Sequence, residues 1–353
     1  MSGRHILVTG GCGFIGQHLV RLLSDRGEQV RVLDLDPVDL GADVEVLRGS
    51  ILDPDRVAEA MKGVDRVYHL AANPNLWSAR RSAFRETNTE GTQVVLDAAL
   101  RAEVERFVYT STESILRGLA SRDEGDGPSD ERVRATLADM PGPYCRSKFL
   151  AERLAGNAAK AGLPVVIVNP TLPVGPGDRL LTPPSRMLLG YLRGRFPAYL
   201  DSAFNMIDVR DVALGHILAA EHGRVGERYI LGGENLHLSE VLSLLADLTG
   251  RPMPRWRIPY WLAYAAALAE EALSRGVTGR PPIAPLTGVR LARAPMTFDN
   301  TKAIRELGLK PRPVRVSLRD AIAWFEAMGH LPAATRTPAP RRRPAWTQIR
   351  AGE

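Results

Sequence analysis

Cysteine is scarce in this chain of 353 residues, which has only Cys12 and Cys145. Two cysteines cannot build the disulfide framework of a small secreted protein, and their spacing matches no metal-binding motif. This scarcity excludes the disulfide-rich secreted class. We therefore expect a cytoplasmic protein without a metal site.

Long apolar runs are also missing. The longest, Ile258–Ala269, falls short of the roughly 18 apolar residues needed to cross a bilayer. Met1–Arg4 leads directly into an apolar run, so no signal peptide is expected. These features predict no transmembrane helix and leave at most peripheral contact with a membrane.

No basic surface interleaved with aromatic residues can be traced in the sequence, although the net charge is +6. Most of that excess lies in residues 331–353, whose Pro, Ala and Arg content predicts a disordered basic tail. Such a tail is usually only solvated, and contact with an anionic lipid surface is the alternative. No nucleic-acid partner is expected. The arginines of the tail are Arg336, Arg341, Arg342, Arg343 and Arg350.

Short apolar segments alternate with amphipathic segments through the first half of the chain. Runs rich in Val, Ile and Leu predict buried strands, and apolar residues at helical spacing predict the helices between them. This alternation favours an α/β fold, a Rossmann doubly wound parallel sheet covered on both faces. The predicted strands are 6–9, 29–33, 44–47, 66–70, 107–111 and 165–169, and the predicted helices are 14–26, 54–61, 84–101 and 144–161.

Proline and glycine become frequent after the last of these strands, which indicates a second unit. We predict a Rossmann domain over 1–169, to which 206–232 returns with a further strand at 228–232. Residues 170–205 and 233–330 are expected to form a smaller C-terminal α/β substrate lobe. Ligands of open parallel sheets bind outside the carboxyl ends of the strands, so the lobe should cover the site there.

The segment Thr9–Gly16 follows the first predicted strand and opens the first predicted helix. Gly10 permits a tight turn, Gly13 a close approach of backbone to pyrophosphate, and Gly16 close contact between helix and strand. The free N–H groups and the positive dipole end of the helix N-terminus suit phosphate groups. The pattern predicts a dinucleotide site.

Asp34 ends the second predicted strand, about 20 residues beyond the glycine turn. A carboxylate there accepts hydrogen bonds from the adenosine ribose diol and repels a 2′-phosphate. We therefore expect NAD as the cofactor, with NADP less favoured. Arg31 and Arg48 are near in sequence, but neither stands directly after the strand, where a phosphate clamp is expected.

Tyr144 and Lys148 are spaced i, i+4 on a predicted helix and therefore share one face. With eight tyrosines and only five lysines in the chain, such a pair is uncommon by chance. A phenol with an ordinary pKa near 10 is a poor base at neutral pH. A neighbouring ammonium and an oxidised nicotinamide would both lower that pKa, so the pair predicts acid–base chemistry. An ordinary surface pair on an amphipathic helix is the alternative.

The strand that precedes a polar excursion ends in Thr110, Ser111 and Thr112. A hydroxyl at this place can hydrogen-bond the reacting oxygen of a substrate and share its proton with Tyr144. Strands also end in Ser and Thr for local capping reasons. Both interpretations stay open, and Ser111 and Thr112 are candidate catalytic residues.

Together these motifs resemble the extended short-chain dehydrogenase/reductase family, the NAD-dependent epimerase/dehydratases. The resemblance covers roughly residues 4–328 and implies a Rossmann fold with bound NAD. It implies that Tyr144 is the general base/acid, that Lys148 is its electrostatic partner and that Thr112 is the catalytic hydroxyl. Further motifs that carry it are His69–Ala72, Asn88 with Gly91-Thr92, Asn169-Pro170, Gly175–Gly177 and Asp208–Ala213.

The same resemblance implies the cofactor-binding residues and the assembly. A homodimer through the helices 84–101 and 144–161 is implied. A small-molecule substrate is expected, and a lipid-linked molecule is one of the alternatives. The residues implied to bind NAD are Gly10, Gly13, Phe14, Ile15, Gly16, Asp34, Ile51, Leu70, Ala71, Ala72, Asn88, Tyr144, Lys148 and Pro170.

Within the family, several stretches are most similar to the hopanoid-associated sugar epimerases, close to the dihydroflavonol reductases. These stretches are Leu76-Trp77, 144–152, 168–175 and 226–235.

Three residues depart from the family pattern. Ser50 replaces the usual acidic residue before the adenine-contacting position. Glu113 follows Thr112 where a small residue is usual, and it either handles a second proton or turns outward. Leu172 replaces the substrate-binding asparagine of nucleotide-sugar epimerases, which argues for a less polar substrate.

Three functions are compatible with these features. The first is hydride transfer at a secondary alcohol or ketone of a bulky, partly apolar substrate, such as a sterol-like ring or a hopanoid polyol side chain. The second is epimerisation or dehydration of a nucleotide sugar with transient NADH, and the third is a non-catalytic NAD-binding protein. An aromatic stripe supports the first function, although such stripes are more often lobe core than lipid-facing surface. The stripe comprises Trp256, Tyr260, Trp261 and Tyr264.

Overall fold

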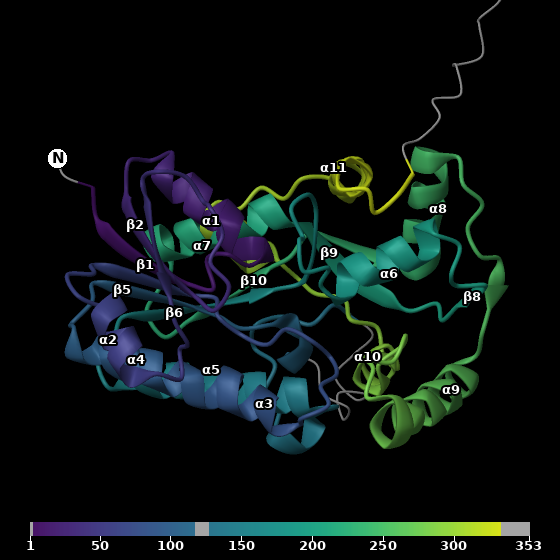
Figure 1. The fold of residues 1–353 in the computed structure, drawn as a ribbon, viewed down its shortest axis with the longest axis horizontal. Helices are drawn as coiled ribbons and strands as arrows, with labels where there is room; N and C mark the ends of the chain where they lie inside the picture. The colour runs from purple at the N-terminus through teal and green to yellow at the C-terminus, as the bar shows by residue number, and fades with distance from the viewer. Residues whose placement is uncertain (1–2, 117–126, 333–353) are drawn as a thin grey trace, which may run out of the picture.

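Seven parallel strands form the central sheet, in the order β3-β2-β1-β4-β5-β6-β10 (Figure 1). The structure is a computed structural model that describes residues 3–116 and 127–332. The strand order reverses between β1 and β4, which is where open α/β sheets bind ligands. The doubly wound Rossmann fold is therefore confirmed. The strands are β1 (His5–Thr9), β2 (Gln29–Asp34), β3 (Val44–Arg48), β4 (Arg66–His69), β5 (Arg106–Thr110), β6 (Val165–Pro170) and β10 (Arg228–Leu231).

Helices cover both faces of this sheet (Figure 1). On one face, α1 (Phe14–Ser24) and α7 (Val209–His222) lie side by side over a core of valine, leucine and isoleucine side chains. On the other face lie α2 (Pro54–Ala60), α4 (Gly91–Arg101) and α5 (Pro143–Lys160). Because both faces are covered, β6 is buried along its whole length.

Local sequence explains where these helices begin. Asp53 caps α2 by accepting hydrogen bonds from the N–H groups of Asp55 and Arg56, at 3.1 and 3.2 Å. Pro54 and Pro143 occupy the first turns of α2 and α5, where the missing proline N–H costs no helical hydrogen bond.

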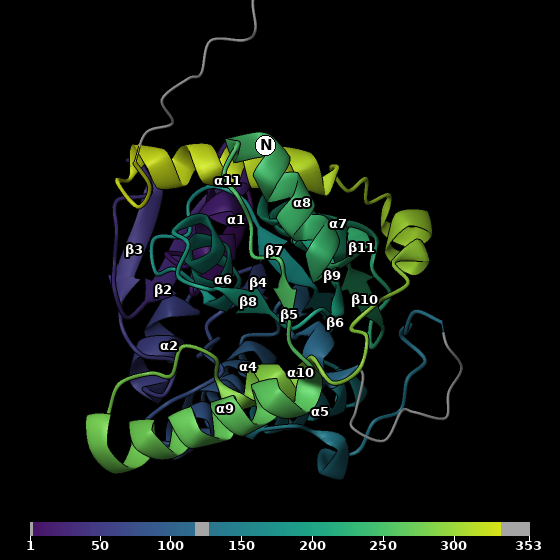
Figure 2. The same ribbon diagram turned by 90° about the vertical axis from the view of Figure 1, so that its right-hand side faces the viewer.

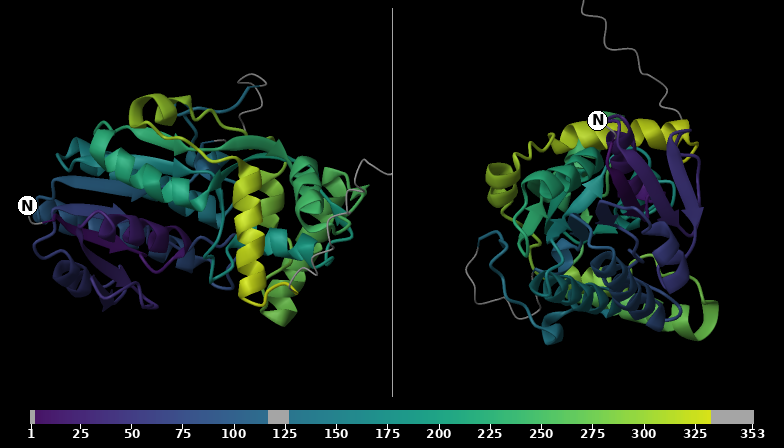
Figure 3. Two further views of the ribbon diagram at one scale, coloured as in Figure 1. Left: turned by 90° about the horizontal axis from the view of Figure 1, so that it is seen from above. Right: turned by 90° about the vertical axis from the view of Figure 1, so that its left-hand side faces the viewer.

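A second, three-stranded sheet organises the C-terminal lobe, in the order β11-β9-β7. Its strand β9 is antiparallel to β11 and parallel to β7. One large core of buried apolar side chains lies between this sheet and the helices around it. The elements are β7 (Leu172–Val174), β9 (Ala203–Asp208), β11 (Glu234–His237), α6 (Pro183–Leu192), α8 (Leu238–Thr249) and α11 (Val314–Ala327), the last of which crosses the lobe in Figure 3.

Two details differ from the segment boundaries expected above. The expected boundary at residue 206 falls inside β9, which belongs to the small sheet, so the return to the Rossmann sheet begins with α7 and ends with β10. Leu331, placed in the tail, is buried in the core of the lobe because it packs with Phe325 and its neighbours. The rest of the expected tail, 333–353, lies outside the described residues, as does 117–126 of the polar excursion.

The last part of the lobe lies below the sheet in Figure 1, beside α3 (Ser82–Arg85). Here α9 (Tyr260–Leu273) packs against α10 (Leu286–Leu291), as Figure 2 also shows. A short parallel pair, β8 (Ala198–Tyr199) and β12 (Trp256–Arg257), precedes them. Within residues 3–116 and 127–332, no helix is long and apolar enough to cross a membrane.

Candidate active site

The glycine turn lies at the carboxyl end of β1 and leads into α1. Gly10 has φ +72°, a left-handed conformation that favours glycine, and a Cβ there would lie 2.7 Å from the backbone nitrogen of Ala71. A Cβ on Gly16 would lie 2.3 Å from the carbonyl oxygen of Gly10. Gly13 precedes α1 and offers no side-chain cap, so the first N–H groups of the helix remain for a ligand.

Asp34 is tied directly to this turn. Its Oδ2 atom accepts a hydrogen bond from the backbone N–H of Cys12 at 3.0 Å, and Oδ1 accepts one from the N–H of Asp36 at 3.2 Å. Each carboxylate oxygen has a second acceptor site, so capacity remains for a ribose diol. The structure therefore brings together Asp34 and the glycine turn, as the sequence motif implies.

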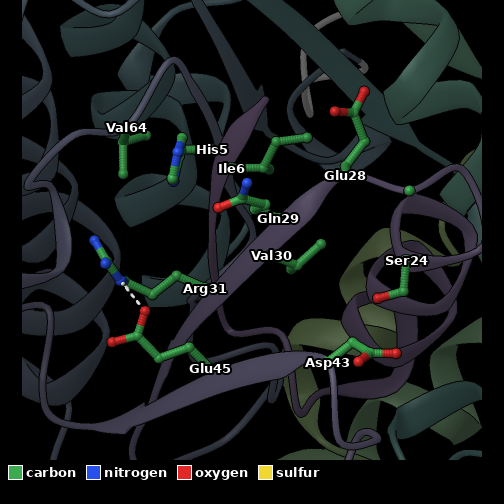
Figure 4. A pocket seen from close by; sticks show the side chains of 11 residues that line it. His5, Ile6, Ser24, Glu28, Gln29, Val30, Arg31, Asp43, Glu45 and Val64 are labelled. Carbon is green, nitrogen blue, oxygen red and sulfur yellow. Dashed lines mark hydrogen bonds and ion pairs between the residues drawn. The ribbon is translucent and has the colours of Figure 1, made fainter. Parts of the chain in front are cut away.

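The two arginines near Asp34 lie in different places. Arg31 forms an ion pair with Glu45, with Nε and Oε2 2.6 Å apart (Figure 4). It also donates to the carbonyl oxygens of Ala60 and Lys62. These bonds hold it in the hollow drawn in Figure 4, at the amino ends of β1 and β2 and on the far edge from the glycine turn. Arg48 is exposed and pairs with Asp34 in strand register.

The remaining residues predicted to bind a cofactor lie along the carboxyl edge of the sheet. Leu70, Ala71 and Ala72 follow β4 and are half-buried, with the N–H of Ala71 donating to the Thr9 hydroxyl at 3.3 Å. Ile51 follows β3 and is buried against Gly91, and Pro170 is the buried last residue of β6. Phe14 and Ile15 begin α1.

Asn88 is buried in a π-helical turn, Glu86–Glu90, between α3 and α4. Its amide nitrogen donates to the carbonyl oxygen of Asn73 at 3.2 Å and to the hydroxyl of Ser147 at 2.9 Å, and its carbonyl oxygen accepts from the N–H of Asn73 at 2.7 Å. Turns of this kind often occur at functional sites. Here the side chain joins the loop after β4 to helix α5.

Tyr144 begins α5, and its ring meets Phe84 edge to face with centroids 6.4 Å apart. Burial raises the pKa of the Tyr144 phenol above its ordinary value, the Glu113 carboxylate raises it further, and a hydrogen bond with Thr112 lowers it. The protein groups around the phenol thus hold its pKa above the ordinary value, and the lowering expected from Lys148 together with an oxidised nicotinamide stays a prediction. The phenol, the Thr112 hydroxyl and the Glu113 carboxyl form one cluster.

Glu113 turns toward this cluster rather than outward. The Thr112 hydroxyl donates to its Oε2 atom at 2.9 Å. Burial raises the pKa of Glu113 to about 7, although its hydrogen bonds partly oppose the shift. A carboxyl with such a pKa exchanges a proton near neutral pH.

Lys148 lies one turn after Tyr144, and its side chain is buried. The Nζ atom donates to the carbonyl oxygen of Thr110 at 2.7 Å and lies 4.8 Å from the centre of the Tyr109 ring. Burial lowers the pKa of Lys148 to about 7, and the carboxylate of Glu152 opposes the shift. The ammonium thus contacts the end of β5, just before the candidate hydroxyls of Ser111 and Thr112.

The two candidate hydroxyls differ in their partners. The Thr112 hydroxyl donates to Glu113 and lies 3.2 Å from the Ser114 hydroxyl, whereas the buried Ser111 hydroxyl has no hydrogen-bond partner among the residues the structure describes. Buried polar groups normally have partners, so Ser111 has capacity for a ligand.

Two side chains that hold these groups in place had no role assigned from the sequence, although Asn169 belongs to a motif quoted above. The Asn169 amide nitrogen donates to the Thr112 carbonyl oxygen at 3.1 Å and to Glu152 at 2.9 Å. His216 bonds the Thr110 hydroxyl at 2.8 Å. The available signal was a polar residue in a run that is otherwise buried, since Asn169 ends an apolar strand and His216 lies on the buried face of α7.

No group of three or more His, Cys, Asp or Glu side chains that could hold a metal ion occurs in residues 3–116 and 127–332. His69, which ends β4, bonds the hydroxyls of Thr9 and Thr92 through its two ring nitrogens, at 2.7 and 3.0 Å. Burial lowers its pKa to about 3, and the charge of Lys148 adds to the shift.

Comparison with known proteins matches residues 6–232 to the model of the NAD-dependent epimerase/dehydratase family. The chain belongs to this family. The expected extended short-chain dehydrogenase/reductase type, an NAD-dependent enzyme, is thereby confirmed.

Known relatives align with this chain over nearly its whole length. A protein named "Putative dihydroflavonol 4-reductase" from Synechocystis sp. is 39% identical and aligns over 92% of this chain and 95% of its own. Sterol demethylase protein B from Methylococcus capsulatus is 35% identical, over 92% and 98%. The crystal structure of gox2253 has a TM-score of 0.80 and 36% identity, over 93% and 100%.

The residues of this family member fit a dinucleotide. Side chains are excluded at Gly10 and Gly16 by the close backbone contacts described above, so the turn presents backbone and the bare start of α1. Asp34 and the unpartnered Ser111 hydroxyl supply polar groups at the same edge of the sheet. NAD is the cofactor of the family.

Proposed function

We propose that this enzyme transfers a hydride between NAD and a secondary alcohol or ketone of a bulky, partly apolar substrate. The observation that supports this most is the cluster of Tyr144, Thr112 and Glu113 at the carboxyl end of β5. It presents two hydroxyl groups and a titratable carboxyl at the same edge of the sheet as the glycine turn.

In this proposal Tyr144 as the phenolate takes the hydroxyl proton of the alcohol during oxidation, and as the neutral phenol it returns that proton during reduction. The Thr112 hydroxyl, held through its backbone by Asn169, hydrogen-bonds the reacting oxygen. Lys148 lies one helical turn after Tyr144, fixes the end of β5 through its bond to the Thr110 carbonyl oxygen, and is the electrostatic partner of the phenol in this proposal. NAD, when bound, supplies the hydride acceptor and a positive charge that favours the phenolate.

Leu172 supports an apolar substrate. It begins β7 and is half-buried against the core of the lobe, where it presents no group that could hydrogen-bond a sugar. The names of several relatives point the same way, since they refer to a dihydroflavonol reductase, a sterol demethylase protein and a 2-alkyl-3-oxoalkanoate reductase. A sterol-like ring or a hopanoid side chain is the substrate class we favour.

A nucleotide-sugar epimerase or dehydratase is the second candidate. The structure titled MoeE5 in complex with UDP-glucose and NAD has a TM-score of 0.71 and 27% identity over 92% of this chain. An enzyme of that type also begins with hydride removal, so the same acid–base cluster would serve it.

The experiment that separates the two candidates is cofactor accounting. The enzyme is incubated with NAD and either a sterol bearing a secondary alcohol or UDP-glucose, and NADH is followed by its absorbance. We expect NADH in a one-to-one ratio with a ketone product from the sterol. Conversion of UDP-glucose without net NADH, together with no NADH from the sterol, would refute the proposal.

We also propose a cytoplasmic location and a homodimer through α4 and α5. Both rest on the resemblance and on the cysteine content rather than on a contact in this structure. Light scattering of the purified protein tests the dimer, and a monomer mass would contradict it.

A further inference from the structure

The helix α9 and its flanks carry an unusual share of the exposed apolar side chains. Of the fifteen large apolar residues exposed among those the structure describes, seven lie between Trp256 and Ile283. Trp256, Trp261, Val277 and Ile283 are exposed by 76, 68, 78 and 75%. We call the seven the α9 surface: Trp256, Trp261, Leu262, Leu268, Leu273, Val277 and Ile283.

The aromatic stripe expected in the lobe core is thus divided. Tyr260 and Tyr264 stack with ring centroids 5.9 Å apart and pack on a small core, so these two residues are part of the lobe core, as the more common interpretation of such a stripe predicts. Trp256 and Trp261 lie outside, so that interpretation is wrong for them.

The division arises because α9 buries its small residues. Only Ala263 and Ala267 of this helix are buried, against Leu286 and Val289 of α10. Large apolar residues of a surface helix normally face the core and charged ones face water. Here Trp261, Leu262 and Leu268 take the outer positions, and no charged residue occurs in 260–269.

The segment that carries the α9 surface has an excess of positive charge, which lies on both sides of the helix in sequence. Residues 251–293 contain seven arginines and two glutamates, a net charge of +5. Both glutamates are engaged within the protein. Glu270 accepts from the N–H groups of Ile283 and Ala284, at 2.6 and 3.3 Å, and Glu271 forms an ion pair with Arg275 at 3.0 Å.

We propose that the α9 surface binds in the plane of an anionic lipid bilayer. Tryptophan, leucine and arginine together are the composition of interfacial helices, whose apolar face enters the acyl region while cations meet lipid phosphates. The helix is too short to span the bilayer, which agrees with a position parallel to it. A second copy of the chain fits less well, because this segment, with a net charge of +5, would face the same charge on the other copy.

The α9 surface lies close to the active site through α10. Gly142, two residues before Tyr144, packs closely against α10. A Cβ added at Gly142 would lie only 2.5 Å from the Thr287 hydroxyl of that helix. Gly288 of the same helix faces Leu76 of the loop after β4. Helix α10 therefore contacts both α9 and the residues just before the catalytic helix. Membrane binding by the α9 surface goes beyond the proposed function and does not depend on it.

Vesicle co-sedimentation tests the surface with the full-length protein and needs no turnover. Phosphatidylcholine vesicles are compared with vesicles that contain roughly 30% phosphatidylglycerol. We expect binding to the anionic vesicles, weakened about tenfold or more in the double variant Trp261→Ser/Leu268→Ser. The matched control is Val225→Ser/Ile304→Ser, which removes two apolar residues exposed elsewhere and should bind like the wild type.

A second variant, Arg255→Gln/Arg280→Gln, tests the electrostatic part and should lose affinity for anionic vesicles alone. Circular dichroism checks that every variant is folded. Unchanged binding by the folded Trp261→Ser/Leu268→Ser variant would overturn the proposal, because another segment would then carry the binding. Absence of vesicle binding by the wild type would also overturn it, and a dimer lost in the same variant would identify an interface between copies.

Discussion

The hydroxyl of Thr112 donates a hydrogen bond to the carboxylate of Glu113 at 2.9 Å, so two neighbouring residues of the chain face the same cluster. This contact decides which way Glu113 points. It also places a carboxyl with a pKa of about 7 beside the phenol of Tyr144, whose own pKa it raises. The protonation state of the cluster is therefore shared among these three side chains.

The raised pKa of Glu113 predicts a pH-dependent gain of stability in Glu113→Gln. The folded protein holds the Glu113 proton more tightly than the unfolded chain, in which the pKa of this carboxyl is 4.5. Protonated Glu113 therefore contributes its full stabilisation below pH 4.5, and this stabilisation is lost as the pH rises through about 7. The amide cannot ionise. Relative to wild type, the variant should gain on the order of 2–3 kcal/mol between pH 4.5 and pH 8.

Urea unfolding at pH 5 and pH 8 measures this difference. Glu59→Gln, at an exposed position of α2, is the matched control and should show no such change. An equal difference between Glu113→Gln and wild type at both pH values would mean that Glu113 is ionised throughout.

Replacing Tyr144 by phenylalanine should reduce kcat at least about 100-fold, because it removes a positioned acid–base group. The edge-to-face contact with Phe84 survives, so folding should not change, and NAD affinity should fall far less than kcat. Steady-state kinetics and NAD titration check this. Tyr264→Phe is the control, and substantial activity in Tyr144→Phe would refute the role of the phenol.

Replacing Asp34 by asparagine should shift the cofactor preference from NAD toward NADP. The amide oxygen can still accept from the N–H of Cys12, so the glycine turn keeps its contact while the charge that repels a 2′-phosphate is gone. The ratio of kcat/KM values for the two cofactors is the readout. Asp39→Asn should leave the ratio unchanged, and an unchanged ratio in Asp34→Asn would show that another group selects the cofactor.

Alanine substitutions at Gly13 and Gly16 should have different effects. A Cβ on Gly16 would meet the Gly10 carbonyl oxygen at 2.3 Å, so Gly16→Ala displaces backbone and should cost about 1–3 kcal/mol of stability. The corresponding distance at Gly13 is 3.2 Å, so that variant should fold nearly normally but bind NAD more weakly. Thermal unfolding and NAD titration separate the effects, and identical behaviour of the two variants would contradict the assignment.

A network centred on the buried Asp208 joins the β9–α7 junction to the last helix of the lobe, through Ser317 and through the pair of Arg210 with Asp320. Asp208, fully buried at the start of α7, accepts from Arg210 at 2.7 and 2.8 Å and from the Ser317 hydroxyl of α11 at 2.7 Å. Arg210→Met leaves this charge without its main partner and should cost about 3–5 kcal/mol of stability. Adding Asp208→Asn should recover part of the loss, as measured by urea unfolding; a double variant less stable than Arg210→Met would contradict this.

Residues close together in the chain made the Rossmann half of the molecule predictable. The alternation of apolar runs and helical spacing indicated six strands and four helices, and the structure has all of them. The Tyr144/Lys148 pair was found because i, i+4 residues share a helix face whatever lies around them. The lobe was less predictable, since its short strands pair over long separations, as β9 does with β11.

The sequence by itself determined the doubly wound sheet, the glycine turn and the spacing of the acid–base pair, because each depends on backbone conformation over a few neighbouring residues. Only the tertiary structure decided that Glu113 faces inward, that Arg31 is held by Glu45, and that the tryptophans of the α9 surface face outward. The physical reason is burial. Which face of a segment is covered depends on partners distant in the chain, such as the α10 side chains that fit against Ala263 and Ala267.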